Sequence, residues 1–252
     1  MSHTAVIVQA RMASTRLPGK VLLELAGTTV LDHVLTRCAA ISEADAVYCA
    51  IPDGVDCDPV AREAERIGAR TGVRVFRGSE SDVLDRYYRT AQAAGADRIL
   101  RVTSDCPLID PAICDAVLRL LDREGADYAT NNMPVGWPHG LDCEAFSFSW
   151  LERAARTALD PFEREHVTPF IRTHAEARKA SLVGPGGDAA LHRWTLDTRA
   201  DLEFLCALFE RLPPGSAGWS YKVPLLIVTE DPALATINAK DNTRLAGPET
   251  CR

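Results

Sequence analysis

The sequence predicts an α/β protein in which helices cover both faces of a mostly parallel sheet. The chain has 252 residues, of which 46% are hydrophobic and 25% charged, as expected for a globular protein with a substantial core. Short apolar runs rich in β-branched residues alternate with amphipathic segments at roughly 25-residue intervals. Connections of this length can return a strand parallel to the previous one through a helix.

This alternation is regular in the first half of the chain. Pro59 and Pro111 stand at first helical positions, where proline is favoured. The predicted strands span 5–10, 46–51, 73–76, 98–103 and 126–130. The predicted helices span 29–40, 59–69, 82–94 and 111–124.

The second half is less regular. It begins with a Pro- and Gly-rich loop at 131–143. The predicted strands here are 144–150, 178–183, 193–196 and 225–228. The predicted helices are 151–159, 163–174, 199–211 and 231–239. No repeat, low-complexity tract or linker interrupts the chain, so we expect one domain over 1–252.

Composition excludes several classes of function. The net charge of −7 argues against a general attraction to nucleic acid or to an anionic membrane. The eight cysteines form no C-x-x-C pair and no zinc-like spacing with histidine, which predicts small buried thiols in a reducing compartment. No apolar run reaches the length of about 18 residues that a membrane span needs, and no signal peptide precedes the first strand. We therefore expect a cytoplasmic protein.

The loop after the first predicted strand carries an unusual group of cations. Arg11, Arg16 and Lys20 fall within ten positions, beside Ser14 and a Pro-Gly turn at 18–19. Backbone N–H groups in such a loop can form a concave nest for an anion, and the cations neutralise its charge. An ordinary solvated loop with unrelated surface cations is the alternative. The carboxyl end of a first strand favours a ligand site.

Two carboxylates follow predicted strands elsewhere in the chain. Asp105 comes directly after the strand at 98–103, and Asp197 ends the short strand at 193–196. Either carboxylate at a strand end could bind a ligand, although Asp105 could instead cap the next turn. Asp201 lies in the first turn of a predicted helix, where it complements the helix dipole, so we expect it to be structural.

Three motifs together resemble a known family. QARMASTRLPGK at 9–20, SDCPLID at 104–110 and WTLD at 194–197 resemble the cytidylyltransferases that activate acidic sugars. Across the whole chain the resemblance is strongest to the spore-coat polysaccharide branch of that family. It implies a Rossmann-like nucleotide-diphospho-sugar transferase fold, with a nucleotide-binding half at 1–130. A sugar-binding and dimerisation lobe at 131–192 and a closing part at 193–252 would follow.

The resemblance also implies an activity. Such an enzyme moves CMP from CTP to a hydroxyl of an acidic sugar and releases pyrophosphate, for polysaccharide or glycan synthesis. The acceptor would be a nonulosonic acid of the sialic, pseudaminic or legionaminic type, and the enzyme a homodimer that uses Mg²⁺. Another acceptor (a sugar phosphate or phosphonate), another nucleotide, or a non-catalytic binding protein are the alternatives.

The family's functional residues map onto positions of this sequence. Ser104 replaces the family's usual glycine, and Arg199-Ala200 replace proline and glutamate. The catalytic residues would be Arg11, Lys20, Asp105 and Asp197, the two aspartates being the metal ligands. Nucleotide contacts would come from Ala10, Arg11, Ser14, Arg16, Lys20, Arg77, Thr103 and Ser104, and sugar contacts from His139, Asp142, Glu144, Glu165 and His166.

Aromatic residues are dense around the predicted dimerisation region at 131–169. Trp137, Phe146, Phe148 and Trp150 lie within a short span of it, which suggests an aromatic interface surface. Burial in the core is the commoner use of tryptophan, and we also consider it for Trp137 and Trp194.

Overall fold

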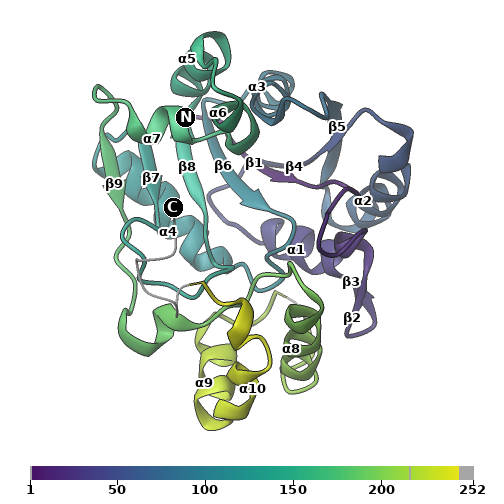
Figure 1. Cartoon of the computed structure of the whole chain (residues 1–252). Coiled ribbons are helices and arrows are strands. Elements are labelled where there is room, and N and C mark those ends of the chain that lie inside the picture. Colours follow the sequence, from purple (N-terminus) through teal and green to yellow (C-terminus); the bar gives the residue numbers. More distant parts are fainter. Residues whose placement is uncertain (1, 216, 244–252) are drawn as a thin grey trace.

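A computed structural model describes residues 2–215 and 217–243 of the chain. Its centre is a seven-stranded sheet in the order β5-β4-β1-β6-β8-β7-β9 (Figure 1). A two-stranded hairpin lies apart from it. The strands are β1 (Thr4–Gln9), β2 (Glu24–Leu25), β3 (Thr28–Thr29), β4 (Ala46–Pro52), β5 (Arg74–Gly78), β6 (Arg98–Thr103), β7 (Tyr128–Thr130), β8 (Glu144–Ser147) and β9 (Lys179–Ser181).

The helices connect and cover these strands. They are α1 (Val30–Cys38), α2 (Asp58–Thr71), α3 (Val83–Ala94), α4 (Pro111–Arg123), α5 (Phe148–Thr157), α6 (Pro161–His166), α7 (Pro169–Thr173), α8 (Arg199–Phe209), α9 (Lys222–Glu230) and α10 (Pro232–Thr236). Short 3-10 turns are η1 (Lys20–Leu22), η2 (Val55–Cys57), η3 (Gly187–Leu191) and η4 (Ala239–Asp241).

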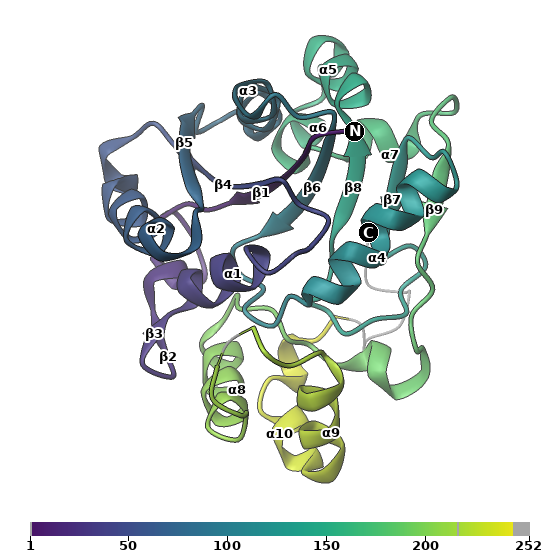
Figure 2. The same ribbon diagram turned by 180° about the vertical axis from the view of Figure 1, so that it is seen from behind.

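β1 is buried on both faces because its side chains alternate between two cores. Val6 and Val8 pack with α1, α2 and α4, whereas Ala5 and Ile7 pack with α3 and α5. Seen from behind, α1, α2 and α4 lie along one side of the sheet (Figure 2). The predicted arrangement, with helices on both faces of the sheet, is confirmed.

The sheet is mostly parallel but changes direction beyond β6. β1 pairs in parallel with both β4 and β6, and β4 with β5. β8 then runs antiparallel to β6 and to β7. The predicted strand at 144–150 is too long, because Ser147 caps α5 by accepting a hydrogen bond from the Trp150 N–H.

The predicted helix at 163–174 is in fact two short helices, α6 and α7. Val167 between them has a φ of 71°, in the left-handed region that helices exclude. Pro169 lacks an N–H donor and disfavours helical backbone at the residue before it. The helix therefore ends before Pro169 and a new one begins there.

Two further predicted strands are wrong. The segment 193–196 is extended but pairs with no strand of the described chain, where a single bridge links Arg193 to His139. The apolar run 225–228 lies inside helix α9, whose buried Pro224 and Val228 are four residues apart and share one face. Pro224 sits in the first turn of that helix, where proline is tolerated.

Three of the four aromatic residues expected at an interface are buried in the protein, and the fourth, Phe148, is half-buried. Phe146 is fully buried, and Trp137 and Trp150 are each 9% exposed. Trp194 is also fully buried. The aromatic surface that suggested a dimer contact is therefore absent at these three residues, and burial of both Trp137 and Trp194 is confirmed.

Other composition-based expectations can be compared with the structure. Six of the seven described cysteines are buried and all seven are free thiols, while Cys251 lies outside the described residues. Within residues 2–215 and 217–243, no helix combines the length and the apolar character needed to cross a membrane.

Candidate active site

Two adjoining pockets open at the carboxyl ends of β1 and β6. These strands end together, since Gln9 pairs with Thr103 in the last register position. The loop pocket, of about 520 Å³, lies over residues 9–21 and also touches α3 and α6. The side pocket, of about 370 Å³, is lined by Thr103, Asp105, Cys106, Asn132, Met133, His139, Asp142, Arg172, Thr195 and Asp197.

The loop that frames the loop pocket is closed by its own backbone. The Gly19 N–H donates to the Met12 carbonyl at 3.1 Å, and the Leu17 N–H donates to Ser14 Oγ at 3.3 Å. Gly19 has a φ of 67°, a left-handed conformation that is strained for residues with a side chain. It directs the chain into η1. Lys20 is the first residue of that turn, so the loop geometry fixes where its side chain starts.

Lys20 joins the two carboxylates that the sequence singled out. Its ammonium donates to Asp105 Oδ2 at 2.7 Å and to Asp197 Oδ1 at 2.9 Å, and also to the Leu196 carbonyl at 2.9 Å. Burial lowers the pKa of Lys20, but Asp105 and Asp197 outweigh it, so the net pKa lies above its ordinary value. Lys20 is therefore charged throughout the neutral range.

The two aspartates are held together by their backbones as well. The Leu196 N–H donates to the Asp105 carbonyl at 2.8 Å, and Thr195 Oγ1 donates to the same carbonyl at 3.3 Å. The segment around 195–197 thus lies directly against the end of β6. Asp105 and Asp197 line both pockets and form the wall between them.

Asp197 is also held from the opposite side. Arg193 donates to Asp197 Oδ2 at 2.9 Å, and Arg16 lies 3.3 Å from the same oxygen. Burial raises the pKa of Asp197, but Lys20 and Arg193, with the charge of Arg16, bring it down to about 2. Oδ1 therefore faces Lys20, while Oδ2 is occupied by arginines.

Asp201 supports this arrangement, in agreement with the structural role expected for it. It is fully buried and forms a capping box with Thr198 at the start of α8. Its carboxylate accepts two hydrogen bonds from Arg193, at 2.8 and 2.9 Å, and one from the Asp197 N–H at 2.9 Å. Asp201 thereby fixes both the arginine and the backbone that present Asp197.

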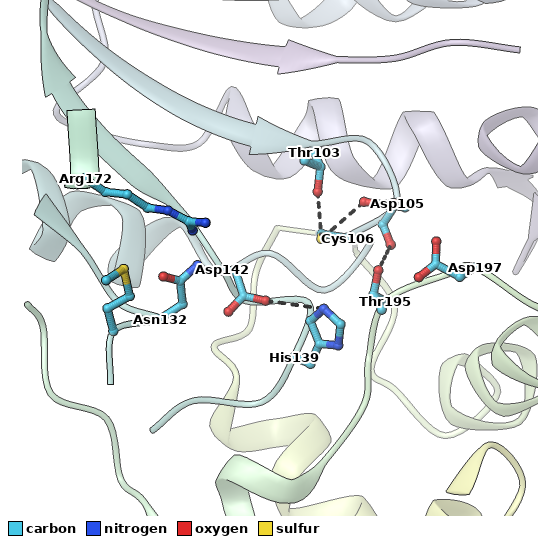
Figure 3. A pocket seen from close by; sticks show the side chains of 10 residues that line it. Thr103, Asp105, Cys106, Asn132, His139, Asp142, Arg172, Thr195 and Asp197 are labelled. Atoms are coloured by element: carbon cyan, nitrogen blue, oxygen red, sulfur yellow. Dashed lines mark hydrogen bonds and ion pairs between the residues drawn. The ribbon is translucent and has the colours of Figure 1, made fainter. Parts of the chain in front are cut away.

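The side pocket is built from segments that are far apart in the sequence (Figure 3). His139 lies 3.8 Å from Asp142 and 3.4 Å from Arg193. Gly140 has a φ of 108°, and a Cβ there would come within 2.7 Å of the Trp194 carbonyl carbon. Only glycine therefore allows the 139–142 loop to approach the segment that carries Asp197.

Most of the predicted site residues line one of the two pockets. All predicted nucleotide contacts except Arg77 line the loop pocket, as do Glu165 and His166. His139 and Asp142 line the side pocket. Arg77 pairs instead with Asp58 at 2.6 Å, and Glu144 is buried, so neither residue lines either pocket.

Several residues that line the pockets or support them were not predicted from the sequence, among them Arg193, Asn132, Arg172 and Arg86. Arg193 lies four residues before Asp197 and eight before Asp201. The sequence does not indicate that it pairs with both, because these contacts depend on the bend of the chain at 198. Asn132 and Arg172 come from loop and helix positions without a motif of their own. Arg86 lines the loop pocket from α3, where the sequence predicts a helix over 82–94 but no site residue.

The residues present suit a hard divalent cation. Asp105 and Asp197 already converge on one cationic group, the Lys20 ammonium. No cluster of three or more His, Cys, Asp or Glu residues with metal-binding geometry occurs in the described part of the chain. A cation bound here would therefore take two carboxylate oxygens from the protein and the rest from water or a ligand, which is how Mg²⁺ is commonly held beside phosphates.

Comparisons with known proteins agree with this geometry. The model of a family described as cytidylyltransferase matches residues 5–207. The chain is 35% identical over 218 residues to the spore coat polysaccharide biosynthesis protein SpsF of Bacillus subtilis, covering 84% of this chain and 88% of that one. It is 32% identical over 211 residues to a 3-deoxy-manno-octulosonate cytidylyltransferase of Anaeromyxobacter dehalogenans, with 77% and 84% covered. A solved cytidylyltransferase from Leptospira borgpetersenii superposes with a TM-score of 0.85 at 31% identity, over 93% of this chain and 97% of that one.

Proposed function

The chain belongs to the cytidylyltransferase family, and we propose that it transfers CMP from CTP to a hydroxyl of an acidic sugar. Pyrophosphate is the second product. The observation that carries this proposal is the meeting of Lys20, Asp105 and Asp197 on the wall between two pockets. A cation-lined pocket suits a triphosphate, and the neighbouring pocket then receives the acceptor.

The loop pocket has the chemistry of a triphosphate site. Arg11, Arg16 and Lys20 line it together with Ser14, at the end of a buried parallel strand. Cations and backbone donors in such a place neutralise phosphate oxygens. Lys20 in this proposal serves the β- and γ-phosphates, with Arg11 beside it.

The shared wall then marks the position of the reacting phosphorus. Asp105 and Asp197 would hold Mg²⁺, which would supply charge neutralisation to the phosphates. The acceptor hydroxyl in the side pocket loses its proton to water and attacks the α-phosphorus in line, so that the new P–O bond forms as the bond to pyrophosphate breaks. The protein contributes mainly by positioning both reactants and by stabilising the charge that develops.

The acidic character of the acceptor is supported by the relatives. One relative is named for 3-deoxy-manno-octulosonate and another for spore coat polysaccharide. We propose a nonulosonic acid as the acceptor, for surface polysaccharide synthesis. A homodimer and a cytoplasmic location remain predictions, and sedimentation at micromolar concentration tests the first of them.

The proposal is tested by a screen for pyrophosphate release. Each of the four nucleoside triphosphates is combined with Mg²⁺ and with 3-deoxy-manno-octulosonate, N-acetylneuraminate, a sugar phosphate or a phosphonate. We expect release only with CTP and an acidic sugar. Release with another nucleotide, or with a sugar phosphate or phosphonate alone, would replace the proposed substrates. CTP binding without any release would indicate a binding protein.

A further inference from the structure

One cation in the side pocket has a side chain without a hydrogen-bond or ion-pair partner among the described residues. Arg172 is the only lysine or arginine among the described residues that line this pocket. Its side chain is half-buried and makes no hydrogen bond or ion pair within residues 2–215 and 217–243. Figure 3 shows its guanidinium extending into the pocket from the side opposite Asp105 and Asp197.

The other cations near the site differ from Arg172 in this respect. Lys20 contacts both aspartates, and Arg193 pairs with Asp197 and Asp201. A guanidinium offers a planar fork of donors that matches a carboxylate, and a partly buried one gains most from such a partner. The side pocket therefore presents one unused site for an anion.

This anion is not the triphosphate. Arg172 lines the side pocket and not the loop pocket, whereas Arg11, Arg16 and Lys20 line the loop pocket and not the side pocket. The wall of Asp105 and Asp197 lies between the two groups. A negatively charged group that reaches Arg172 must belong to the acceptor.

Arg172 lies on α7, a helix so short that its position depends on contacts with the rest of the fold. α7 has five residues, and its N-cap residue Thr168 makes no side-chain cap. The Thr168 hydroxyl instead donates to Glu144 Oε1 at 2.7 Å, in the buried interior. The Thr168 carbonyl accepts the Arg172 N–H at 2.9 Å, so Thr168 links the core to the arginine.

Glu144 is a fixed anchor for this link. Its carboxylate also accepts hydrogen bonds from Tyr128 and Arg101, each at 2.5 Å. Burial raises its pKa, but the Arg101 charge and the bonds from Tyr128 and Thr168 bring the net pKa below its ordinary value, so it is ionised. Such buried ion pairs contribute little net stability, and fixing a geometry is one use attributed to them.

We propose that Arg172 binds the carboxylate of the acceptor and that Glu144 positions it through Thr168. This inference rests on the proposed function, because it names the residue that makes an acidic sugar the preferred acceptor. It also replaces the direct sugar contact expected of Glu144, which acts through the start of α7.

The first test compares R172Q and R172K with the wild type, using CTP and 3-deoxy-manno-octulosonate or N-acetylneuraminate, whichever is turned over. We expect R172Q to raise the acceptor KM roughly 10- to 100-fold, the effect of losing a charged hydrogen bond, with the KM for CTP unchanged. R172K keeps the charge but not the planar fork of donors, so its acceptor KM should lie between those of the wild type and R172Q. With the acceptor's carboxamide, wild type and R172Q should perform alike.

The second test separates positioning from general stability. T168V removes the link to Glu144 and should raise the acceptor KM several-fold, about 1 kcal/mol for one hydrogen bond. T168S keeps the hydroxyl and should restore the wild-type KM. T173V removes an exposed hydroxyl from the same helix and serves as the matched control. E144Q should follow T168V, and T168V combined with R172Q should be no worse than R172Q alone.

The outcomes distinguish the two proposals. CTP binding is measured by calorimetry for every variant, and pyrophosphate release by the wild type tests the proposed function. Release together with an unchanged acceptor KM in R172Q overturns the role of Arg172 alone. If no acid supports release, the acids are titrated by NMR into wild type and R172Q in the presence of CTP. Equal binding, or none, then overturns the role of Arg172 as well.

Discussion

The loop pocket and the side pocket share a wall but are assembled in different ways. Most of the loop pocket comes from one continuous segment at 9–21, and 103–105 adds the end of the neighbouring strand. The side pocket takes its lining from four separate stretches, at 103–106, 132–142, 172 and 195–197. The first depends on local backbone geometry, whereas the second exists only once distant parts of the chain have packed.

This difference matches the two substrates of the proposed reaction: the loop pocket would bind CTP, and the side pocket would bind the acceptor. A triphosphate needs cations and backbone donors, which a single Gly-containing loop can provide. An acceptor has a particular shape and charge, and its pocket depends on the lengths and positions of several loops. We expect substitutions in the two pockets to affect CTP and acceptor separately, and substitutions in the shared wall to affect both.

The largest effect is expected from the shared wall. D105N and D197N should each lower kcat roughly 100- to 1,000-fold without unfolding the protein, since each removes a charge from a pocket rather than from the core. The double variant should be little worse than either single one, because the two groups act as a unit. Excess Mg²⁺ should partly restore the single variants. Turnover by initial rates and folding by circular dichroism provide the measurements.

D53N is the control for these variants, since it removes the charge of an exposed aspartate outside both pockets. Full activity in either aspartate variant would remove that residue from the metal site. An effect on acceptor use alone would contradict the idea that the wall serves both pockets.

The loop pocket should respond to the loss of Lys20. K20A should weaken CTP binding or turnover at least tenfold, on the order of 1.4 kcal/mol, because the triphosphate loses a neutralising charge. The exposed Lys222 provides a matched control, K222A, far along the chain. Calorimetric CTP binding measures the effect. Unchanged binding and turnover in folded K20A would remove Lys20 from the proposed site.

The charges of the wall also predict a pH dependence of stability. The pKa of Asp197 is lowered to about 2, so its carboxylate stabilises the fold fully above pH 4 and progressively less as the pH falls toward 2. D197N should therefore be less stable than wild type by about 1 to 2 kcal/mol at pH 6, allowing for partial exposure, and the gap should close toward pH 2.

Denaturant unfolding at pH 6, 4 and 2.5 measures this gap. D53N is the control, since Asp53 is exposed and makes no side-chain hydrogen bond or ion pair in the described part of the chain. A gap that widens on acidification would contradict the ion-paired state of Asp197.

The smallest effect is expected in the side pocket. Asp142 accepts the Gly140 N–H at 3.1 Å and faces His139. D142N should raise the acceptor KM about fivefold, the worth of one hydrogen bond, and leave CTP binding unchanged. Weaker CTP binding in D142N would show that the two pockets do not divide the substrates as proposed.

The same contrast explains which features could be read from the sequence. The motif at 9–20 is continuous, so its position at the end of β1 was predictable from a single apolar run followed by cations and a Pro-Gly turn. Asp105 and Asp197 were each recognised at the end of an extended segment. Their contact through Lys20 is tertiary, and no spacing in the sequence indicates it.

The failures come from tertiary context. The run 225–228 has the residues of a strand, yet it lies in α9, where contacts with the neighbouring α8 and α10 replace strand pairing. Arg77 was predicted to follow a strand, but it lies within β5 and its side chain pairs with Asp58 on α2. Arg172 belongs to no motif. Its proposed role rests on the lack of a side-chain hydrogen bond or ion pair within the described fold, which the sequence does not reveal.

The two hydrogen bonds from 195–196 to the Asp105 carbonyl have a consequence for chain length. They fix the two carboxylates relative to each other regardless of the path that the chain takes between them. Insertions or deletions within 107–191 can therefore reshape the proposed acceptor pocket while Asp105 and Asp197, the proposed metal ligands, keep their spacing. A fold of this design can exchange one substrate for another by changing loops, with the chemical step left in place.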